Sequence, residues 1–262
     1  MLLKTLIPFL EENEKDIKIH FARGSKIPEE ALMVFLMGGF KEWQEYQSKL
    51  NFGRSYIISL IRMGNMEWLF GGVYVVKGYK PLQDGHYRYK TELASVGKEL
   101  IGKVIVKFVR TFRQSYCCLE NYIDKLNVIE IRRDVYALPF PGYDKVSLSW
   151  KELYSVINTE AWKTALQNQK GVYLITDTSN GKLYVGSAFG DEMLWGRWKS
   201  YIETGHGGNK ELKRLKFNHI KEHFRYTVLD VYKGTVDDEI ILQRENWWKN
   251  ALQSREYGYN RN

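Results

Sequence analysis

The stretch from residue 171 to residue 197, GVYLITDTSNGKLYVGSAFGDEMLWGR, contains the pattern that decides the fold of the C-terminal part of the chain. Its segments Val172–Thr176 and Leu183–Ala188 are short and apolar, and they contain the β-branched residues that favour strands. The polar pair Asn180-Gly181 between them is typical of a tight hairpin turn. The sequence therefore predicts a β-hairpin, followed by a helix that carries Arg197.

The two predicted strands carry the same signature in opposite order, Gly171-Val172-Tyr173 and Tyr184-Val185-Gly186. A phenol has an ordinary pKa of about 10, so a tyrosine is a poor base unless a cation or a metal favours the phenolate. Most strand tyrosines pack in a core. Either tyrosine taken alone therefore indicates little about function.

Arg197 and Tyr201 lie four residues apart on a helix predicted over 193–203, so their side chains share one face. The guanidinium group offers a fixed fork of donors that matches phosphate oxygens, and it stays charged when it is partly buried. A surface arginine beside a packing tyrosine is the ordinary explanation of this pair taken alone.

Glu245 is more informative, because it interrupts an apolar stripe. On a helix predicted over 236–252, Ile241, Trp248 and Leu252 lie on one face, and Glu245 falls among them. A carboxylate on the buried side of a helix is costly unless it is paired or holds a cation. An ion pair with an arginine and a Mg²⁺ ligand both explain this position.

Together, the paired tripeptides, the Arg197-x-x-x-Tyr201 spacing and the position of Glu245 resemble the GIY-YIG nuclease family over about residues 168–262. Valine replaces isoleucine in both tripeptides, which is a conservative change in a strand. The resemblance implies an α+β domain with a small antiparallel sheet flanked by helices. It also implies an endonuclease that hydrolyses phosphodiester bonds of double-stranded DNA.

The resemblance assigns an expected role to each site residue. Tyr173 is expected to act as the general base or to position the water, with help from Tyr184, and Arg197 to stabilise the charge of the phosphorane. Glu245 is expected to hold a single Mg²⁺ ion, for which Mn²⁺ is the alternative. These groups supply the activated water, the charge neutralisation and the metal that phosphodiester hydrolysis requires.

Three further residues are candidates for the site. The Arg197-x-x-x-Tyr201 spacing is similar to the restriction-enzyme branch of the family, so Tyr201 is expected to share the proton chemistry or to orient the phosphate. Asn260 matches a late asparagine of the family and is expected to support the site. His206 in the glycine loop 205–208 is an alternative acid or base, because histidine titrates near neutral pH, but we rank it below Tyr201.

The formal net charge of +8 makes an anionic partner plausible. Lysine and arginine outnumber acidic residues between Arg197 and Arg225, immediately after the hairpin. We predict that a helix over 210–216 begins after an asparagine cap. Five residues of this stretch are predicted to contact DNA: His206, Asn209, Lys210, Lys213 and Arg214.

Residues 1–145 are predicted to form a β-rich, barrel-like α+β domain, and residues 146–262 the nuclease domain. Strand-forming residues recur over 17–22, 55–61, 67–76, 86–94, 104–112 and 128–135. Helices are predicted at 2–13, after Pro28 and at 40–50, and a loop rich in Pro and Gly, 139–142, precedes the boundary. Candidate N-caps for helices at 150–157, 160–168 and 236–252 are Ser149, Thr159 and Thr235.

The N-terminal domain is rich in aromatic residues, among them Trp43, Tyr46 and Trp68, with basic residues interspersed. An aromatic core is the ordinary explanation, because strands bury their aromatic side chains. The alternative is a DNA target-recognition module whose aromatic side chains stack on an extruded base. The segment Trp68–Val73 resembles PUA-like barrels that hold modified bases, which implies a nuclease directed to modified or foreign DNA.

The composition bears on where in the cell the protein resides. No apolar segment reaches the ~20 residues of a membrane span. The start, MLLKTLIPFLEENEK, turns acidic and lacks a small-residue cleavage site, so we expect an amphipathic helix there and a cytoplasmic protein. Cys117 and Cys118 are adjacent in a strand-like stretch and point to opposite sides, so ordinary buried thiols are expected.

These observations favour a Mg²⁺-dependent restriction or phage-defence endonuclease. The alternative is a structure-selective repair or recombination nuclease, or a homing-type nuclease, in which the N-terminal domain would recognise DNA shape. A nucleic-acid-binding protein without activity is the third hypothesis. Because one site cuts one strand, double-strand cleavage requires a homodimer or sequential nicking.

Overall fold

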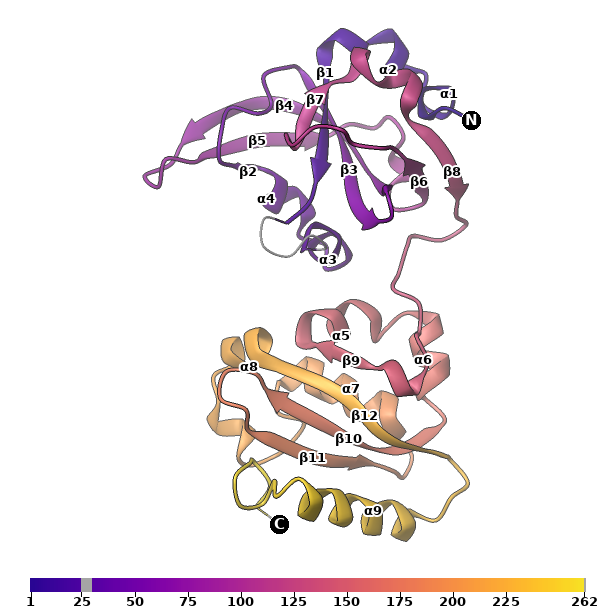
Figure 1. Cartoon of the computed structure of the whole chain (residues 1–262), viewed down its shortest axis with the longest axis vertical. Helices are drawn as coiled ribbons and strands as arrows, with labels where there is room; N and C mark the ends of the chain where they lie inside the picture. Colours follow the sequence, from indigo (N-terminus) through magenta and orange to yellow (C-terminus); the bar gives the residue numbers. More distant parts are fainter. Residues whose placement is uncertain (25–29, 262) are drawn as a thin grey trace. The chain divides into compact units, whose positions relative to one another are not determined.

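A computed structural model describes residues 1–24 and 30–261, and the chain divides into two compact units, Met1–Tyr136 and Ala137–Asn262 (Figure 1). The division precedes the Pro/Gly loop, whereas the sequence places the boundary after it, near residue 145. The loop belongs to the C-terminal unit because Trp162 Nε1 donates to the carbonyl oxygen of Leu138 at 2.9 Å, and the Phe140 ring packs edge-on against Trp162. Pro28 lies outside the described residues.

The N-terminal unit is built on a curved sheet with short helices around it. Its helices are α1 (Leu3–Leu6), α2 (Phe9–Glu12), α3 (Glu30–Leu36) and α4 (Phe40–Gln44). Its strands are β1 (Ile17–Ala22), β2 (Tyr46–Gln47), β3 (Tyr56–Gly64), β4 (Glu67–Pro81), β5 (Tyr87–Leu93), β6 (Val104–Lys107), β7 (Tyr116–Cys118) and β8 (Asn127–Ile131).

The long strand β4 gives this sheet its half-barrel shape. The strand order is β2-β5-β4-β3-β1-β7, and β6 pairs with the opposite end of β4 and with β8. Near the point where β4 changes partners, Gly72 has a φ of +114° beside a bulge in the β3–β4 pairing. The named strand pairs are antiparallel, except that β1 runs parallel to β3.

Two predicted helices of this unit are shorter than their sequence patterns indicate. The helix predicted over 2–13 is interrupted between α1 and α2 at Ile7-Pro8, where proline supplies no backbone N–H. The helix predicted over 40–50 ends at Gln44, because β5 binds the chain that follows: the Tyr89 N–H donates to the carbonyl oxygen of Glu45 at 2.8 Å.

The C-terminal unit is an α+β domain with a small antiparallel sheet, as predicted. Its strands follow the order β11-β10-β12-β9. They are β9 (Ser147–Ser149), β10 (Gln169–Asp177), β11 (Leu183–Ala188) and β12 (Phe224–Lys233). The helices are α5 (Trp150–Val156), α6 (Glu160–Leu166), α7 (Met193–Thr204), α8 (Phe217–His223) and α9 (Asp238–Ala251).

Helix starts in this unit test the predicted caps. Ser149 caps α5 in a reciprocal box with Glu152, as its sequence position indicates. Thr159 occupies the N-cap position of α6, as predicted, but its hydroxyl donates to the carbonyl oxygen of Val156 and makes no capping hydrogen bond. Helix α9 is capped by Asp237 and not by Thr235. The helix predicted over 210–216 is also wrong: that stretch forms a turn and a short 3-10 helix, Leu212–Arg214.

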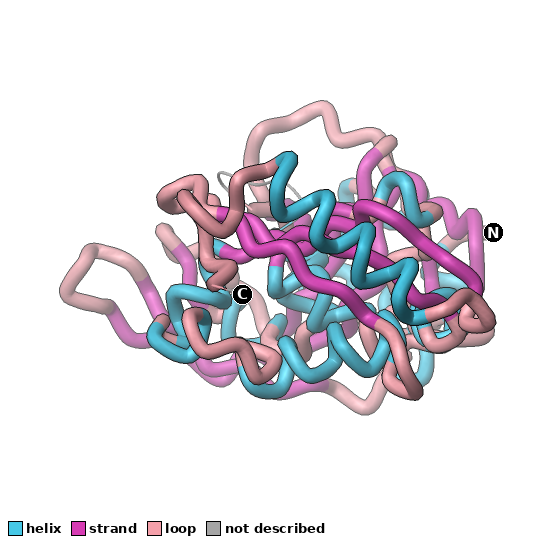
Figure 2. Tube along the Cα trace, turned by 90° about the horizontal axis from the view of Figure 1, so that it is seen from below, coloured by secondary structure: helices cyan, strands magenta, loops and turns pink. Residues whose placement is uncertain are grey.

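Helices α7 and α9 cover opposite faces of the sheet. Consecutive residues of β10 point to opposite sides, and Tyr173 packs against Trp198 and Tyr201 of α7, whereas Val172 joins a cluster with Ile241 of α9. In the view from below, α9 lies across the strands that it contacts (Figure 2). Since β11 is an edge strand, groups from both helices can meet along it.

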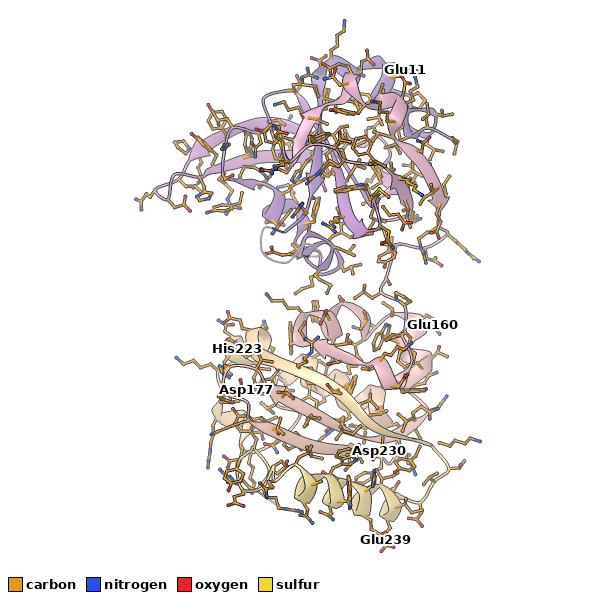
Figure 3. The ribbon with its side chains drawn as sticks, viewed as in Figure 1. Glu11, Glu160, Asp177, His223, Asp230 and Glu239 are labelled. Atoms are coloured by element: carbon orange, nitrogen blue, oxygen red, sulfur yellow. The ribbon has the colours of Figure 1, made fainter. Side chains whose placement is uncertain are left out.

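Two aspartates, the buried Asp177 and the half-buried Asp230, join separate segments of this domain through hydrogen bonds (Figure 3). At the hairpin turn, Asp177 accepts hydrogen bonds from the Tyr259 hydroxyl at 2.7 Å and from Ser179, and it pairs with His219. Near α9, Asp230 accepts from Arg244 Nε at 2.7 Å, which joins β12 to that helix. Hydrogen bonding to neighbouring groups lowers the pKa of Asp177 to about 2 although burial opposes this change.

Within the described residues, no helix is long and apolar enough to cross a membrane.

Candidate active site

Close backbone approach explains both glycines of the hairpin signature. Tyr173 of β10 is paired with Gly186 of β11, and a Cβ atom on Gly186 would lie 2.5 Å from the hydroxyl oxygen of that tyrosine. A Cβ atom on Gly171 would lie 2.5 Å from the carbonyl oxygen of Asp230 in β12. The tyrosine ring therefore lies over a bare stretch of backbone, which only glycine provides.

Tyr173 is the centre of a buried cluster of tyrosines. Its hydroxyl lies 3.0 Å from the Tyr201 hydroxyl and accepts a hydrogen bond from Arg197 Nε at 2.9 Å. Arg197 also places its guanidinium carbon 5.5 Å from the centre of the Tyr201 ring. Arg197 and Tyr201 thus share one face of α7, as their spacing predicts, and both meet the tyrosine of β10.

Burial controls the protonation of these phenols. It raises the pKa of Tyr173 far above the ordinary value of tyrosine, although Arg197 acts in the opposite direction. Burial raises the pKa of Tyr201 in the same way. Tyr173 is therefore a neutral phenol at physiological pH, and its hydroxyl fixes Arg197 by accepting a hydrogen bond from Nε.

The glycine loop 205–208 closes over the tyrosine cluster. Arg197 Nη1 donates to the carbonyl oxygen of Gly207 at 3.0 Å, and a Cβ atom on Gly207 would lie 2.7 Å from the Tyr201 ring. Arg197 Nη2 has no hydrogen-bond partner among the described residues, so the fixed guanidinium keeps donors available for an anion.

A cavity of about 540 Å³ lies along the edge strand β11 and collects three of the predicted residues: Tyr184, Arg197 and Glu245. Asp191 and Glu192, which precede α7, also line it. Tyr173 and Tyr201 lie beneath Arg197 and do not line this cavity. The cavity therefore combines a fixed cation with carboxylates.

Glu245 has a partner that the sequence interpretation missed. Glu245 is 8% exposed, and Lys249, one helical turn later, is 3% exposed with its ammonium nitrogen 3.2 Å from Glu245 Oε1. The buried carboxylate is thus in an ion pair, with a lysine and not with an arginine. The four-residue spacing on α9 was the available signal, because such residues share a helix face.

The donor set at Glu245 fits a divalent ion that keeps several water ligands. No group of three or more His, Cys, Asp or Glu side chains in the described part of the chain is arranged to hold a metal. Mg²⁺ typically uses one or two carboxylates and completes its shell with water and phosphate oxygens. Glu245 supplies one such carboxylate at the wall of the cavity.

Asn260 binds the backbone of the edge strand and does not line the cavity. Its Oδ1 accepts from the Val185 N–H at 2.8 Å, and its Nδ2 donates to the carbonyl oxygen of Val185 at 2.8 Å. The side chain thus extends the sheet beyond β11, between Tyr184 and Gly186. Its place indicates a positioning residue.

We predict that Asn260→Ala loosens β11. Removing both hydrogen bonds leaves the buried amide and carbonyl of Val185 without partners, at a cost of about 1–3 kcal/mol. Hydrogen exchange at peptides containing Val185 should become about 10- to 100-fold faster, while exchange in β3 of the other unit stays unchanged. Unchanged protection at Val185 would show that the Asn260 contacts do not stabilise the strand.

The predicted DNA-contact residues are of two kinds. Lys210, Lys213 and Arg214 are exposed, and Arg214 pairs with Glu211 at 2.9 Å. Asn209 has a structural task, because its side-chain oxygen accepts from the backbone N–H groups of Glu211 and Leu212. His206 Nδ1 accepts from the Gly208 N–H at 3.0 Å within the glycine loop.

The hairpin, the arginine of α7 and the carboxylate of α9 define a nuclease domain of the GIY-YIG class. Residues 169–260 match the family model described as the GIY-YIG catalytic domain, and this part of the chain belongs to that family. Nucleases of this family generally depend on a divalent metal ion and act on DNA.

The chain is similar to intron-associated endonuclease 1 of Enterobacteria phage T4, with 35% identity over 92 residues. This match covers 35% of the present chain and 36% of the relative, so the chain spans about a third of that protein's length. Two solved structures also match, the catalytic domain of homing endonuclease I-TevI and a mutant of the catalytic domain of intron endonuclease I-TevI. The homing-endonuclease domain is 35% identical, and the match covers 35% of this chain and 96% of that structure. The mutant domain is 33% identical, and the match covers 36% of this chain and 94% of that structure. Both TM-scores are 0.29.

Proposed function

We propose that the protein is a Mg²⁺-dependent endonuclease that hydrolyses DNA phosphodiester bonds, in which the N-terminal unit recognises the target. Restriction or defence against phage is the role that we favour, with modified or foreign DNA as the substrate. The observation that carries the catalytic part is the fixed guanidinium of Arg197, which lines one cavity with the buried carboxylate of Glu245.

Arg197 is suited to bind the scissile phosphate. Tyr173 and the Gly207 carbonyl oxygen hold two of its nitrogens, so the fork is preorganised before the substrate arrives. A preorganised cation in a partly buried site stabilises charge that develops in the transition state more strongly than one in water. Arg197 would therefore neutralise the pentavalent phosphate.

Glu245 would hold the metal ion, with Mn²⁺ as the alternative to Mg²⁺. When bound there, a divalent ion would neutralise phosphate charge and lower the pKa of a water molecule. Lys249 places its ammonium nitrogen 3.2 Å from Glu245 Oε1, and this pairing offsets part of the cost of a buried carboxylate within a largely apolar stripe.

Tyr173 would hold the guanidinium of Arg197 through its buried neutral hydroxyl, and Tyr184, which lines the cavity, would position the attacking water. Tyr173→Phe should reduce the rate of DNA cleavage by about 10²-fold, the effect of displacing a group that acts on the reacting atoms. Because burial raises the pKa of Tyr173, the wild-type pH–rate profile should show no ionisation of this residue below about pH 10. Single-turnover cleavage across pH measures both effects.

Tyr201→Phe is the matched control for this substitution. The Tyr201 hydroxyl is fully buried and contacts the Tyr173 hydroxyl, so its removal should slow cleavage by less than about tenfold. Equal large losses in the two variants would contradict a specific role of the Tyr173 hydroxyl in holding Arg197. They would indicate that the two buried hydroxyls fix the guanidinium as one unit.

A homing-type nuclease is the second candidate, and the printed names of the relatives favour it: one is intron-associated and another is a homing endonuclease. Their similarity is limited to the catalytic domain, within residues 169–260 of the family match. The N-terminal unit lies outside this match, so the similarity does not decide between a restriction role and a homing role. A structure-selective repair nuclease would also recognise its target through that unit.

One experiment separates these candidates. Full-length protein with Mg²⁺ is incubated with plain, methylated, hydroxymethylated and glucosylated DNA of one sequence, and with branched and flapped substrates. We expect cleavage of intact duplex that depends on base modification. Preference for branches would favour the repair role, cleavage at one rare plain sequence the homing role, and absence of cleavage on every substrate a nucleic-acid-binding protein without activity.

The number of strands cut is a further part of the proposal. A single site hydrolyses one strand, so a double-strand break would need a homodimer or two sequential events. The amounts of nicked and linear plasmid, measured at several protein concentrations, distinguish these routes. A homodimer should give linear product without accumulating nicked product, whereas sequential events should give nicked product first.

A further inference from the structure

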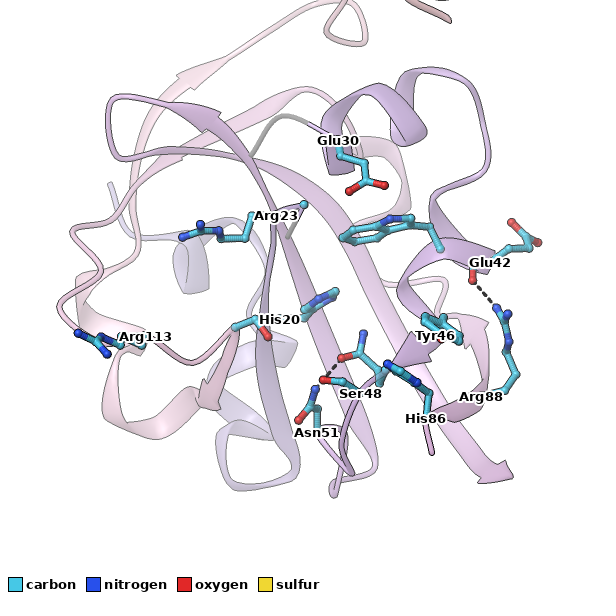
Figure 4. A pocket seen from close by; sticks show the side chains of 14 residues that line it. His20, Arg23, Glu30, Glu42, Tyr46, Ser48, Asn51, His86, Arg88 and Arg113 are labelled. Carbon is cyan, nitrogen blue, oxygen red and sulfur yellow. Dashed lines mark hydrogen bonds between the residues drawn. The ribbon is translucent and has the colours of Figure 1, made fainter. Parts of the chain in front are cut away.

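The N-terminal unit contains a cavity of about 670 Å³, which is within the size range of small-molecule sites. Residues from β1, α4, β2 and β5 and from the segments around them line it. In the close view, Arg23 and Arg113 lie on one side of His20, and Tyr46, His86 and Arg88 lie on the other (Figure 4). None of these residues belongs to the catalytic domain.

Aromatic rings provide flat walls in this cavity. Trp43 is stacked on His20 with ring centres 6.2 Å apart, and Tyr46 is stacked on His86 at 4.8 Å. Trp68, Phe70 and other strand aromatics are buried in the core, as the ordinary explanation of the aromatic residues predicts. Trp43 and Tyr46 are the exceptions that remain open to the cavity.

The cavity is lined by buried polar residues whose hydrogen bonds are incomplete. His20 Nδ1 and Asn51 Oδ1 are buried and have no hydrogen-bond partner among the described residues, and both side chains line the cavity. Buried polar atoms are nearly always paired, so each exception requires an explanation. A ligand in this cavity would complete the bonding of Asn51 Oδ1, beside the His20 ring.

A chain of amides fixes the orientation of Asn51. The carbonyl oxygen of Gln44 can only accept, so Gln47 must present its NH₂ group to it, which it does at 2.7 Å. Gln47 Oε1 consequently faces Asn51, whose NH₂ group donates to it at 2.7 Å. The remaining oxygen of Asn51 is thus held as a hydrogen-bond acceptor.

His20 adds a neutral ring to this site. Burial lowers the pKa of His20 to about 4, so the imidazole is uncharged at physiological pH. One of its ring nitrogens then donates and the other accepts. A flat neutral ligand that carries both donors and acceptors at its edge matches this surface better than a charged one.

Charged groups surround the entrance. Arg23 and Arg113 are exposed and have no hydrogen-bond or ion-pair partner within the part of the chain that the structure describes. Arg88 donates to the carbonyl oxygen of Glu42 at 2.8 Å and lies over the Tyr46 ring. Arginines at the entrance suit a phosphate that accompanies a flat ring.

We propose that this cavity binds one nucleotide of the DNA substrate, with its extruded base against Trp43 near His20 and Asn51, and its phosphates beside Arg23 and Arg113. The proposal rests on the proposed nuclease function and names how the N-terminal unit recognises a target. The fixed acceptor of Asn51 favours a base with an exocyclic amino group, which cytosine, adenine, guanine and their modified forms carry and thymine lacks.

The test uses the full-length chain and two binding probes. Calorimetry without metal measures the binding of four nucleotides. These are the 5′-monophosphates of 2′-deoxycytidine, 5-methyl-2′-deoxycytidine, 5-hydroxymethyl-2′-deoxycytidine and 2′-deoxyadenosine. Cleavage is measured on the panel of modified and plain DNAs. Trp43→Leu should weaken nucleotide binding by about 10- to 100-fold, the range for loss of base–aromatic stacking, and should abolish the difference between DNAs. The matched control, Tyr79→Leu, removes an aromatic side chain that does not line the cavity and should change neither readout.

Because Trp43 also packs on Phe40, a second variant avoids the core. The exposed pair Arg23→Ala/Arg113→Ala should weaken nucleotide binding by about tenfold, whereas Arg132→Ala/Arg133→Ala outside the cavity should not. Cleavage that discriminates equally in wild type and in both cavity variants would overturn the proposal. So would nucleotide binding that these variants abolish while DNA discrimination persists, since the cavity would then serve a free nucleotide.

The same samples separate this proposal from the nuclease assignment. If Arg197→Ala abolishes cleavage and Trp43→Leu changes neither binding nor discrimination, the nuclease stands and the nucleotide site is refuted. If the wild type cleaves no DNA but binds nucleotides through Trp43, the nuclease is refuted and the nucleotide cavity is supported.

Discussion

Arg197→Ala should lower the single-turnover rate of DNA cleavage by about 10³- to 10⁵-fold, the effect of removing a cation that stabilises a phosphoryl transition state. The guanidinium is held by the Tyr173 hydroxyl and the Gly207 carbonyl oxygen, so its loss removes a preorganised donor and not a mobile surface charge. The equilibrium affinity for DNA should change by less than about tenfold, because the exposed basic residues near the site remain.

Two variants make this prediction specific. Arg197→Lys keeps the charge but cannot donate to Tyr173 and Gly207 as a planar fork, so it should still lose about 10²-fold in rate. Arg214→Ala removes an exposed arginine that pairs with Glu211, and it should change the rate by no more than a few-fold. A rate for Arg197→Ala close to that of Arg214→Ala would exclude a role in the transition state.

The hairpin and its two flanking helices could be predicted because local patterns specify them. The apolar, β-branched composition of Val172–Thr176 and Leu183–Ala188 and the Asn180-Gly181 turn are local signals. The spacing of Arg197 and Tyr201 likewise places both on one helix face. The reason for Gly186 was not accessible, because it depends on the Tyr173 ring lying across the partner strand.

The ion-pair partners of the buried and half-buried carboxylates could be identified only partly from the sequence. The stripe on α9 predicts that Glu245 is buried, but it does not decide between an ion pair and a metal. The structure shows that Lys249 is the paired cation, and that Asp230 holds α9 through Arg244. The second of these contacts joins elements that are distant in sequence, so no local pattern contains it.

The residues that line the cavity of the N-terminal unit could not be predicted from the sequence. Aromatic and basic residues of that unit are visible in the sequence, but most aromatics pack in the core and only a few face the cavity. The distinction depends on the early end of α4 at Gln44, after which β2 turns toward β5 and places Tyr46 beside His86. The sequence pattern predicts a longer helix there, so it cannot separate core from cavity.

Glu245→Gln should abolish metal-supported cleavage while leaving the shape of the side chain intact. Loss of the carboxylate charge removes the ligand that we assign to Mg²⁺, and the rate at fixed Mg²⁺ should fall by about 10³-fold or more. Binding of Mn²⁺ in the absence of DNA, followed by electron paramagnetic resonance, should weaken in parallel. This second readout does not depend on activity.

Lys249 decides how the effect of this substitution is interpreted. Glu245→Gln removes one ion-pair contact of the buried Lys249 ammonium, and this loss destabilises α9 independently of any metal. The double variant Glu245→Gln/Lys249→Met removes both charges and should restore the thermal stability without restoring metal binding or cleavage. Recovery of cleavage in the double variant would show that Glu245 acts only as the partner of Lys249.

Lys249→Met alone gives the converse expectation. With the ammonium gone, nothing on α9 offsets the charge of Glu245 at that oxygen, so a divalent ion should bind more tightly, by about tenfold, than in the wild type. A carboxylate that serves as a metal ligand must gain affinity when its competing cation is removed. A purely structural ion pair would instead lose stability and gain no affinity for Mn²⁺.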